Sequence, residues 1–430
     1  MDYDLIVKDV TIIHKNGTIS GKTNIYIKNG RIEKVGPTEE GCATETVAGD
    51  GLFATPGFVN LHAHSPMNIF KGIAEDVTIE DWFNREIFPY ESRLTGEDAY
   101  WGASLAIAEM IDNGVTAFAD HYFFADQISA AVLDAGIRGD IAATIFGIAA
   151  DFQTQLAAAA AVIERRNGQS VRLNLRMGPH APYTCPPDRL RVIIRSAQQL
   201  DVGIHIHVSE TKQQVDESIR SFSKTPLALL SECGGMELPT IIGHGLWLRD
   251  EELSFLNART YLAVCPKTYL KLGMGFGILW EKYKDLPLAI GTDGAASSNT
   301  LSPMEQARLF GLAGKFICNQ PEEYTLTGIW RMLMRGHDAL NFQTGEIAAG
   351  YKADLLLWDL NQTNTAPVYN PLAAIIYSAD SRNIIHSLVE GKFVKRCGQV
   401  QMDTAYILKQ VSRIQERLLQ YGKGAAKQQY

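Results

Sequence analysis

The middle of the chain alternates short apolar segments with longer helical ones, and no other feature limits the possible folds as much. Eight short runs have the apolar character of buried strands: 58–61, 117–119, 141–145, 173–177, 203–208, 240–242, 261–264 and 288–290. Helical stretches separate many of them, including 96–113, 155–166, 187–200, 226–232 and 250–257. Regular alternation predicts a parallel sheet, and eight repeats predict a closed (β/α)₈ barrel of the TIM type. An open doubly wound sheet is disfavoured because no Gly-x-Gly-x-x-Gly follows the first strand.

The two ends of the chain have a different pattern, in which short strands alternate with turns. Strand-like runs occupy 5–7, 10–13, 24–27 and 31–35 near one end, and 353–358, 384–389 and 392–395 near the other. We therefore predict one small β-sandwich domain assembled from residues 1–55 and 347–402. The barrel then takes residues 56–346, and residues 403–430 form a carboxy-terminal helix, with helical spacing over 404–419, and a polar tail.

Composition excludes several classes of protein. The 430 residues are 46% hydrophobic and 20% charged, as in packed globular proteins, and the net charge of −8 disfavours a surface built for nucleic acid or anionic lipid. The longest apolar runs fall short of the roughly 18 residues of a membrane helix, and the amino terminus lacks a secretory layout. The six cysteines form no C-x-x-C pair, which is typical of reduced thiols. We expect a cytoplasmic protein without a nucleic-acid or membrane partner.

Five polar residues lie at the carboxyl ends of predicted barrel strands, where barrel enzymes build their active sites. His62 and His64 form an H-x-H whose side chains share one face of a strand. His207, His244 and Asp293 end or follow three further strands. Imidazoles and a carboxylate in this number suit one divalent ion with an open position for water, either Zn²⁺ or Fe²⁺. The alternative is that these five residues are unrelated polar side chains, each hydrogen-bonded on its own. That would require a polar residue to occur by chance at the carboxyl end of four different strands.

The remaining histidines have weaker signals. His205 shares a face with His207 but lies deeper in the barrel, so we expect it to be a packing residue. His14, His337 and His386 fall in the β-rich ends or outer helices, where a structural role is expected. His121 follows the strand at 117–119 and is left open as a pocket residue.

Several motifs together resemble the amidohydrolase superfamily. They are Pro-Gly-Phe-Val-Asn-Leu-His-Ala-His at 56–64, His-Val-Ser-Glu at 207–210, Ile-Gly-His at 242–244 and Gly-Thr-Asp-Gly-Ala at 291–295. Within the superfamily, the chain is most similar to the methylthioadenosine/S-adenosylhomocysteine deaminase family. The similarity covers nearly the whole chain, including Gly-Tyr-Lys-Ala-Asp-Leu at 350–355, which resembles the family's return from barrel to β-sandwich.

The resemblance implies a ligand set for the metal and a hydrolytic deaminase that releases ammonia from a purine-type heterocycle. The metal would be held by His62, His64, His207 and Asp293. One metal per chain is expected, because the segment 176–183 lacks the lysine that bridges two metals in other members. Self-association is common in the family, so a homo-oligomer is expected as well.

The resemblance also implies substrate contacts, and the residue types indicate catalytic roles. His180 matches a substrate-contacting histidine, and Glu91 matches an acidic residue that holds ribose hydroxyls. A bound metal lowers the pKa of its water to about 7, and Asp293 could accept the proton of that water. Glu210 could protonate a ring nitrogen and later the leaving ammonia, while His244 would orient the attacking hydroxide and steady the developing charge.

Departures from the family pattern leave the substrate open. No arginine occurs in 139–147, where the family usually has one, and Lys267 and Tyr269 replace small polar residues. S-Adenosylhomocysteine, methylthioadenosine and adenosine all remain candidates. Alternative substrates are a pterin, guanine or a triazine, and the triazine would lose an amine or chloride. A more remote alternative is that the chain is a non-catalytic assembly protein.

Overall fold

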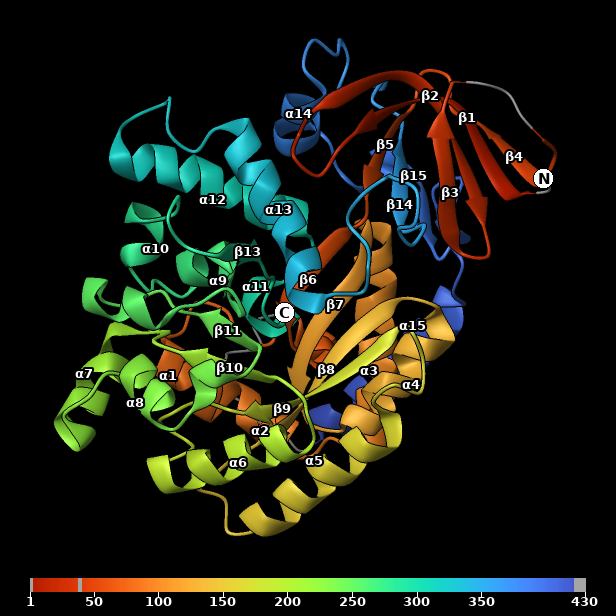
Figure 1. Ribbon diagram of the computed structural model, residues 1–430. Coiled ribbons are helices and arrows are strands. Elements are labelled where there is room, and N and C mark those ends of the chain that lie inside the picture. The colour runs from red at the N-terminus through yellow and green to blue at the C-terminus, as the bar shows by residue number, and fades with distance from the viewer. Residues whose placement is uncertain (1–2, 38–40, 421–430) are drawn as a thin grey trace.

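The computed structural model describes residues 3–37 and 41–420, so residues 421–430 of the predicted tail lie outside the described part. Two sheets organise these residues. A parallel barrel occupies the centre of the molecule, and a mixed sheet built from both ends of the chain lies beside it (Figure 1).

Each of the eight predicted barrel strands is confirmed. They are β6 (Phe58–Ala63), β7 (Val115–Tyr122), β8 (Arg138–Ile145), β9 (Leu173–Pro179), β10 (Ile204–Val208), β11 (Thr240–His244), β12 (Thr260–Val264) and β13 (Leu288–Ile290). Every strand pairs in parallel with the next. The amides of Thr292 and Asp293 donate to the carbonyl of His62 at 3.0 and 2.9 Å, which joins the last strand to the first. The barrel is therefore closed.

Helices cover the outside of the barrel. The longer ones are α3 (Gly96–Asp112), α4 (Ala125–Ala135), α5 (Phe152–Arg166), α6 (Pro187–Gln199), α7 (Lys212–Phe222), α8 (Pro226–Glu232), α12 (Pro303–Cys318), α13 (Leu326–Leu340) and α15 (Thr404–Leu419). Local chemistry explains where they begin: Thr95 and Asp98 form a capping box at α3, as Thr211 and Gln214 do at α7. Shorter helices are η3 (Gly235–Glu237), α14 (Pro371–Ala373), η5 (Ala374–Ser378) and η6 (Ser381–Asn383).

The helix predicted at 250–257 is a 3₁₀-helix instead, η4 (Asp250–Phe255). Asn257 stops it, because its side chain donates to the carbonyl of Met236 at 2.7 Å and accepts from the amide of Arg259 at 2.8 Å. A side chain bonded to both sides of the turn holds the backbone out of the helix.

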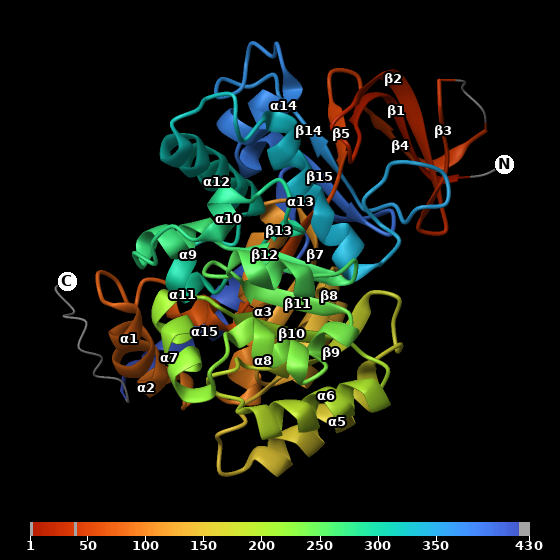
Figure 2. The same cartoon turned by 60° about the vertical axis from the view of Figure 1, so that its left-hand side comes forward.

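Short helices gather at the carboxyl ends of the barrel strands. They are η1 (Ser65–Phe70), α1 (Ile79–Asp81), η2 (Trp82–Ile87), α2 (Phe88–Glu91), α9 (Pro266–Lys271), α10 (Ile278–Glu281) and α11 (Ala295–Ser298). Figure 2 shows α1, α2, α7 and α11 on the same side of the barrel. They surround the mouth of the central cavity.

The second sheet joins the two ends of the chain, as predicted. Its strands are β1 (Tyr3–Ile13), β2 (Ile19–Lys28), β3 (Arg31–Gly36), β4 (Ala43–Ala48), β5 (Phe53–Pro56), β14 (Leu355–Trp358), β15 (Ile384–Val389), β16 (Lys392–Arg396) and β17 (Gln399–Val400). They form one hydrogen-bonded sheet, in which β14 from the later segment pairs with β5 from the earlier one. The chain passes from this sheet to the barrel between β5 and β6 and returns after α13. We therefore keep 1–55 with 347–402, 56–346 and 403–430 as proposed domain limits.

A buried ion pair connects the two sheets. Arg138 of β8 donates to both carboxylate oxygens of Asp354, at 2.6 and 2.9 Å, and neither side chain is exposed to solvent. Asp354 also accepts from the amide of Glu390 at 2.9 Å. Among the described residues, no helix is long and apolar enough to span a bilayer.

Candidate metal centre and active-site cavity

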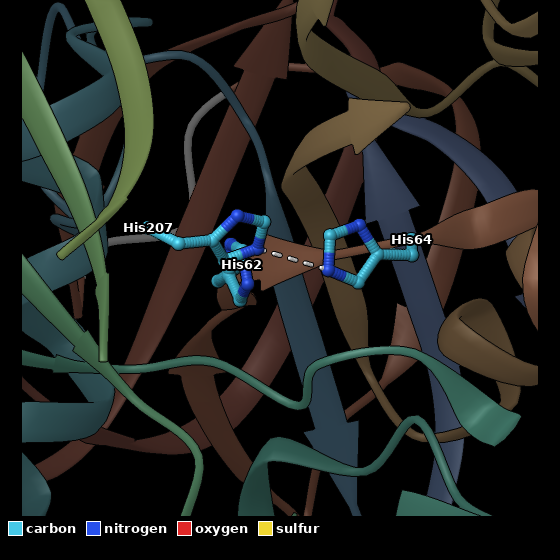
Figure 3. A group of neighbouring side chains, drawn as sticks. All are labelled: His62, His64 and His207. Atoms are coloured by element: carbon cyan, nitrogen blue, oxygen red, sulfur yellow. Dashed lines mark hydrogen bonds between the residues drawn. The ribbon is translucent and has the colours of Figure 1, made fainter. Parts of the chain in front are cut away.

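The predicted ligands meet at the carboxyl end of the barrel. His62 belongs to β6 and His64 directly follows it, His207 belongs to β10, and Asp293 follows β13 (Figure 3 shows the three histidines). The Nε2 atom of His64 lies 3.2 Å from Asp293 Oδ1 and 3.3 Å from His207 Nε2. Ligand atoms of the three histidines lie within 4.8 Å of one another, and the same holds for His62, His244 and Asp293. The structure thus brings the sequence-predicted set together.

Hydrogen bonds at the outer nitrogen orient all three imidazoles. Each ring uses Nδ1 for a protein partner: His62 for Nε2 of His205 (2.8 Å), His64 for the carbonyl of His121 (2.6 Å) and His207 for the carbonyl of His180 (2.8 Å). The Nε2 atom therefore faces the centre in each case, and that of His62 is buried without a hydrogen-bond partner. An Nδ1 partner with a free Nε2 is the arrangement of metal-binding histidines. The donor set fits a divalent cation.

Protonation at the centre follows from burial and from Asp293. Burial lowers the pKa values of His62 and His207 well below 6.5, so both rings are neutral, as metal binding requires. Burial acts the same way on His64, but the adjacent Asp293 carboxylate outweighs it and raises the pKa of His64 to about 9. A proton and a cation therefore compete for Nε2 of His64. The same contact holds the pKa of Asp293 far below its usual range, against the effect of burial.

Two further predicted residues lie beside this cluster. His244 Nε2 is 3.5 Å from Glu210 Oε1, and Gln214 Nε2 donates to Glu210 Oε2 at 3.3 Å. Asp293 Oδ2 accepts from Ser297 Oγ at 3.1 Å. His244 and Asp293 also have positive φ angles, 73° and 62°, which cost a residue with a side chain free energy and cluster at functional sites.

A cavity of about 510 Å³ opens from the cluster toward the short helices. It is lined by Glu210, His244 and Asp293 at the reacting end and by the two predicted substrate residues, Glu91 and His180. Glu91 accepts a hydrogen bond from the hydroxyl of Tyr122 at 2.6 Å. Burial raises the pKa of Glu91, and the Tyr122 bond partly offsets the effect.

Sequence reasoning missed Tyr122, left His121 open as a pocket residue and expected His205 only to pack. His121 is buried in the cavity wall, where burial lowers its pKa to about 3, and Tyr122 beside it contacts Glu91. His205, expected to pack, holds the Nδ1 of His62. A signal for His121 and Tyr122 was present in the sequence, because Ala-Asp-His-Tyr forms the carboxyl end of β7, where barrel enzymes place functional residues. Only the structure could reveal the contact of His205.

Lys267 and Tyr269, which stand where the family pattern has small polar residues, do not obstruct the cavity. Lys267 points away from it and binds Thr300 at 3.0 Å and Glu305 at 2.8 Å. Tyr269 is buried, with its ring centroid 5.7 Å from that of His244 and its hydroxyl unpartnered.

Comparison with known proteins agrees with this geometry. The model of the amidohydrolase family matches residues 53–394, which covers the whole barrel and the strands β5, β14 and β15 of the second sheet. The chain belongs to the amidohydrolase family. A relative in Desulforudis audaxviator, named 5-methylthioadenosine/S-adenosylhomocysteine deaminase, is 33% identical over 408 residues, 92% of this chain and 95% of the relative.

Solved structures give the same result for the fold. An adenosine deaminase from Xanthomonas campestris with bound zinc superimposes with a TM-score of 0.92 at 28% identity, covering 97% of this chain and 99% of that one. An atrazine chlorohydrolase from Arthrobacter aurescens TC1, complexed with zinc, has a TM-score of 0.87 at 19% identity, covering 96% of this chain and all of that one. The amidohydrolase described here is a metal-dependent hydrolase of carbon–nitrogen bonds other than peptide bonds, of the deaminase type.

Proposed function

We propose that this amidohydrolase deaminates a purine nucleoside of the 5′-methylthioadenosine, S-adenosylhomocysteine or adenosine class and releases ammonia. One observation carries the proposal: the three histidine Nε2 atoms and Asp293 meet at the closed end of a cavity that also exposes Glu210. The names of the deaminase relatives, at 33% and 34% identity, support the substrate class.

The metal in this proposal is held by His62, His64, His207 and Asp293. When bound, a divalent metal of this kind lowers the pKa of water to about 7 and so supplies a nucleophile at neutral pH. We propose zinc, because imidazole nitrogen with one carboxylate oxygen suits it and two structural neighbours contain it. The Nε2 atom of His62 is buried and has no hydrogen-bond partner, so a bound cation would satisfy it. This supports the assignment of His62 as a metal ligand.

Proton movements fall to three side chains. Asp293, ionised because His64 lies against it, accepts a proton from the attacking water, and Ser297 holds its second oxygen. Glu210 donates a proton to the ring nitrogen next to the amino-bearing carbon, and its carboxylate then relays to the amino group the proton that Asp293 took from water, so that ammonia leaves. The proton of the added hydroxyl returns to Glu210 as the carbonyl forms. His244, 3.5 Å from Glu210, orients the nucleophile and stabilises charge that develops on it. Glu91 binds the ribose hydroxyls, and His180 contacts the base.

Other substrates have less support. The atrazine chlorohydrolase is 19% identical and shares the fold alone, whereas the deaminase relatives cover nearly the whole chain. A proton donor such as Glu210 also favours an amine over chloride as leaving group, because ammonia must be protonated as it departs. A non-catalytic assembly protein would have no use for a complete ligand set at the end of a cavity.

The test is an ammonia-release assay on protein with quantified metal, against adenosine derivatives, guanine, pterins and aminotriazines. The variant Glu210→Gln should keep its metal and lose at least about 100-fold in kcat, the usual contribution of a general acid–base group. Glu251→Gln, at a highly exposed site on η4, serves as the control and should match the parent protein. Full activity in Glu210→Gln would remove Glu210 from the mechanism, and silence toward every nucleoside would remove the substrate class.

We further propose a homo-oligomer in the cytoplasm. The six cysteines carry free thiols, in keeping with a reducing compartment. Leu312 and Phe316, one turn apart on α12, expose 50% and 84% of their surface, an apolar face suited to contact between copies. Sedimentation analysis would measure the oligomeric state.

A further inference from the structure

We infer that the site selects nucleosides whose 5′ substituent is uncharged and apolar, and discriminates against a substituent that carries a carboxylate. This inference rests on the proposed function and deepens it. It predicts that 5′-methylthioadenosine is a better substrate than an adenosine 5′-thioether whose tail ends in a carboxylate and carries no ammonium group. The argument comes from the outer part of the cavity, beyond the metal ligands.

The orientation of a nucleoside is set by the two ends of the cavity. The reacting carbon must reach Asp293 and Glu210, and the proposed ribose contact, Glu91, lies along the wall. The 5′ substituent then projects toward the rim, where the lining side chains are open to solvent. Ile148 and Tyr183 are 64% and 48% exposed there.

Outside the proposed metal centre, the charged side chains of the described cavity lining are all acidic. Among the described residues that line it, the carboxylates are Glu80, Glu91, Glu210, Glu217 and Asp293, and none is lysine or arginine. Glu80 and Glu217 belong to the rim, on α1 and α7. A substrate carboxylate at the rim would therefore meet charges of its own sign and would lose water without gaining an ion pair.

Cations that neighbour the lining residues in sequence are already paired with carboxylates. Four of them pair with carboxylates that do not line the cavity: Arg85 with Asp81 (3.1 Å), Lys212 with Asp216 (2.6 Å), Lys267 with Glu305 (2.8 Å) and Lys271 with Glu75 (2.6 Å). A fifth, Arg220, lies 3.8 Å from the rim carboxylate of Glu217, on the exposed side of α7. No described lining residue thus offers a substrate carboxylate a lysine or arginine partner, and the chain's net charge of −8 adds no long-range attraction.

The same wall favours an apolar group. Phe146 stacks on His180 with ring centroids 4.3 Å apart and on Phe123 at 5.6 Å. Tyr183 meets the edge of His180 at 5.7 Å, and Ile148 continues the surface outward. Aromatic faces and an aliphatic side chain bury a thioether and its methyl group favourably, and sulfur makes additional contacts with aromatic rings.

A matched pair of ligands isolates the charge. Two adenosine 5′-thioethers of equal length, one ending in a carboxylate and the other in the carboxamide, differ little in size. The metal-loaded enzyme should deaminate the carboxamide with a kcat/KM at least about tenfold above that of the carboxylate, since like charges and lost hydration penalise only the acid. 5′-Methylthioadenosine should be at least as good as the carboxamide.

Binding to the same three nucleosides, measured by calorimetry, separates this inference from the proposed function. If none is deaminated, the proposed function falls, while at least tenfold tighter binding of the carboxamide still supports the charge selection. If acid and carboxamide bind and react within twofold of each other, the selection is wrong even though deamination stands.

A variant provides a second test at the rim. Ile148→Arg places a cation among the acidic residues and should reduce the carboxamide-to-carboxylate ratio of kcat/KM at least about fivefold. Val171→Arg is the matched control, because Val171 is 63% exposed and lies outside the cavity, before β9. It should leave the ratio unchanged. An equal effect of both variants would show that total charge, not the rim, governs selection.

Discussion

At the scale of single residues, the metal centre depends on groups that touch no metal. His205 contacts His62 at 2.8 Å, and this contact leaves Nε2 of His62 aimed at the centre. Its own Nδ1 has no hydrogen-bond partner, and burial lowers the pKa of His205 well below 6.5, so the ring is neutral. His205 is therefore a positioning residue for the first ligand.

The variant His205→Ala removes that support and should weaken metal affinity about 10- to 100-fold, the usual cost of losing a partner of a ligand. Competition with a chromophoric chelator measures this independently of turnover. His14→Asn is the control, since His14 follows β1 in the other sheet. An unchanged metal affinity in His205→Ala would leave His205 with a packing role only.

At the scale of elements, helix α13 is tied to the start of the barrel by His337. The ring donates from Nε2 to the carbonyl of Gly57, just before β6, and Nδ1 accepts from the hydroxyl of Thr344, both at 2.8 Å. Burial is the main cause that lowers the pKa of His337 to about 4. The neutral ring is the form that makes both bonds.

This shift makes folding stability depend on pH. The unfolded chain binds a proton at His337 near pH 6.5 and the folded chain only near pH 4, so the free energy of unfolding falls as pH drops through this window. At pH 5 the loss from this residue is about 2 kcal/mol. His337→Gln keeps a donor for Gly57 and should lose less stability between pH 7 and pH 5 than the parent. Denaturation in guanidinium at both pH values measures the difference, and equal losses would contradict the assignment.

At the scale of the whole molecule, the barrel and the mixed sheet are joined by Arg138 and Asp354. Asp354 lies in the Ala-Asp-Leu part of the 350–355 motif, just before β14, and Arg138 is the first residue of β8. Their side chains are fully buried and form two hydrogen bonds. Such a pair stabilises little relative to apolar residues, but losing one partner leaves a buried charge alone.

Asp354→Asn should therefore lower the free energy of unfolding by about 3–5 kcal/mol, because Arg138 keeps its buried charge and loses its directly hydrogen-bonded carboxylate, with only Glu390 left at 3.8 Å. The amide retains an oxygen for the Glu390 amide, so the loss reports mainly on charge. Asp216→Asn breaks an exposed ion pair within α7 and should cost less than about 1 kcal/mol. Thermal and chemical denaturation measure the loss of stability in both variants. Similar losses would show that burial does not determine how much the Arg138–Asp354 pair contributes to stability.

Much of the barrel was predictable because its signals are local. Strands such as β10 and β11 are continuous apolar runs, and helices such as α3 start at a Thr-x-x-Asp cap. The 3₁₀-helix η4 was not predictable, because Asn257 ends it through a contact with the distant carbonyl of Met236. Such contacts leave no periodic trace in the chain.

By itself the sequence determined the metal-binding residue types and their positions at strand ends, because a period of two and the β/α repeat place those side chains at one end of a barrel. The tertiary structure decided which groups support them and what the rim accepts. His205 beneath His62, Tyr122 on Glu91 and the acidic residues Glu80 and Glu217 come from separate parts of the chain. They meet only when the barrel closes, since contact between remote side chains depends on packing rather than on local order.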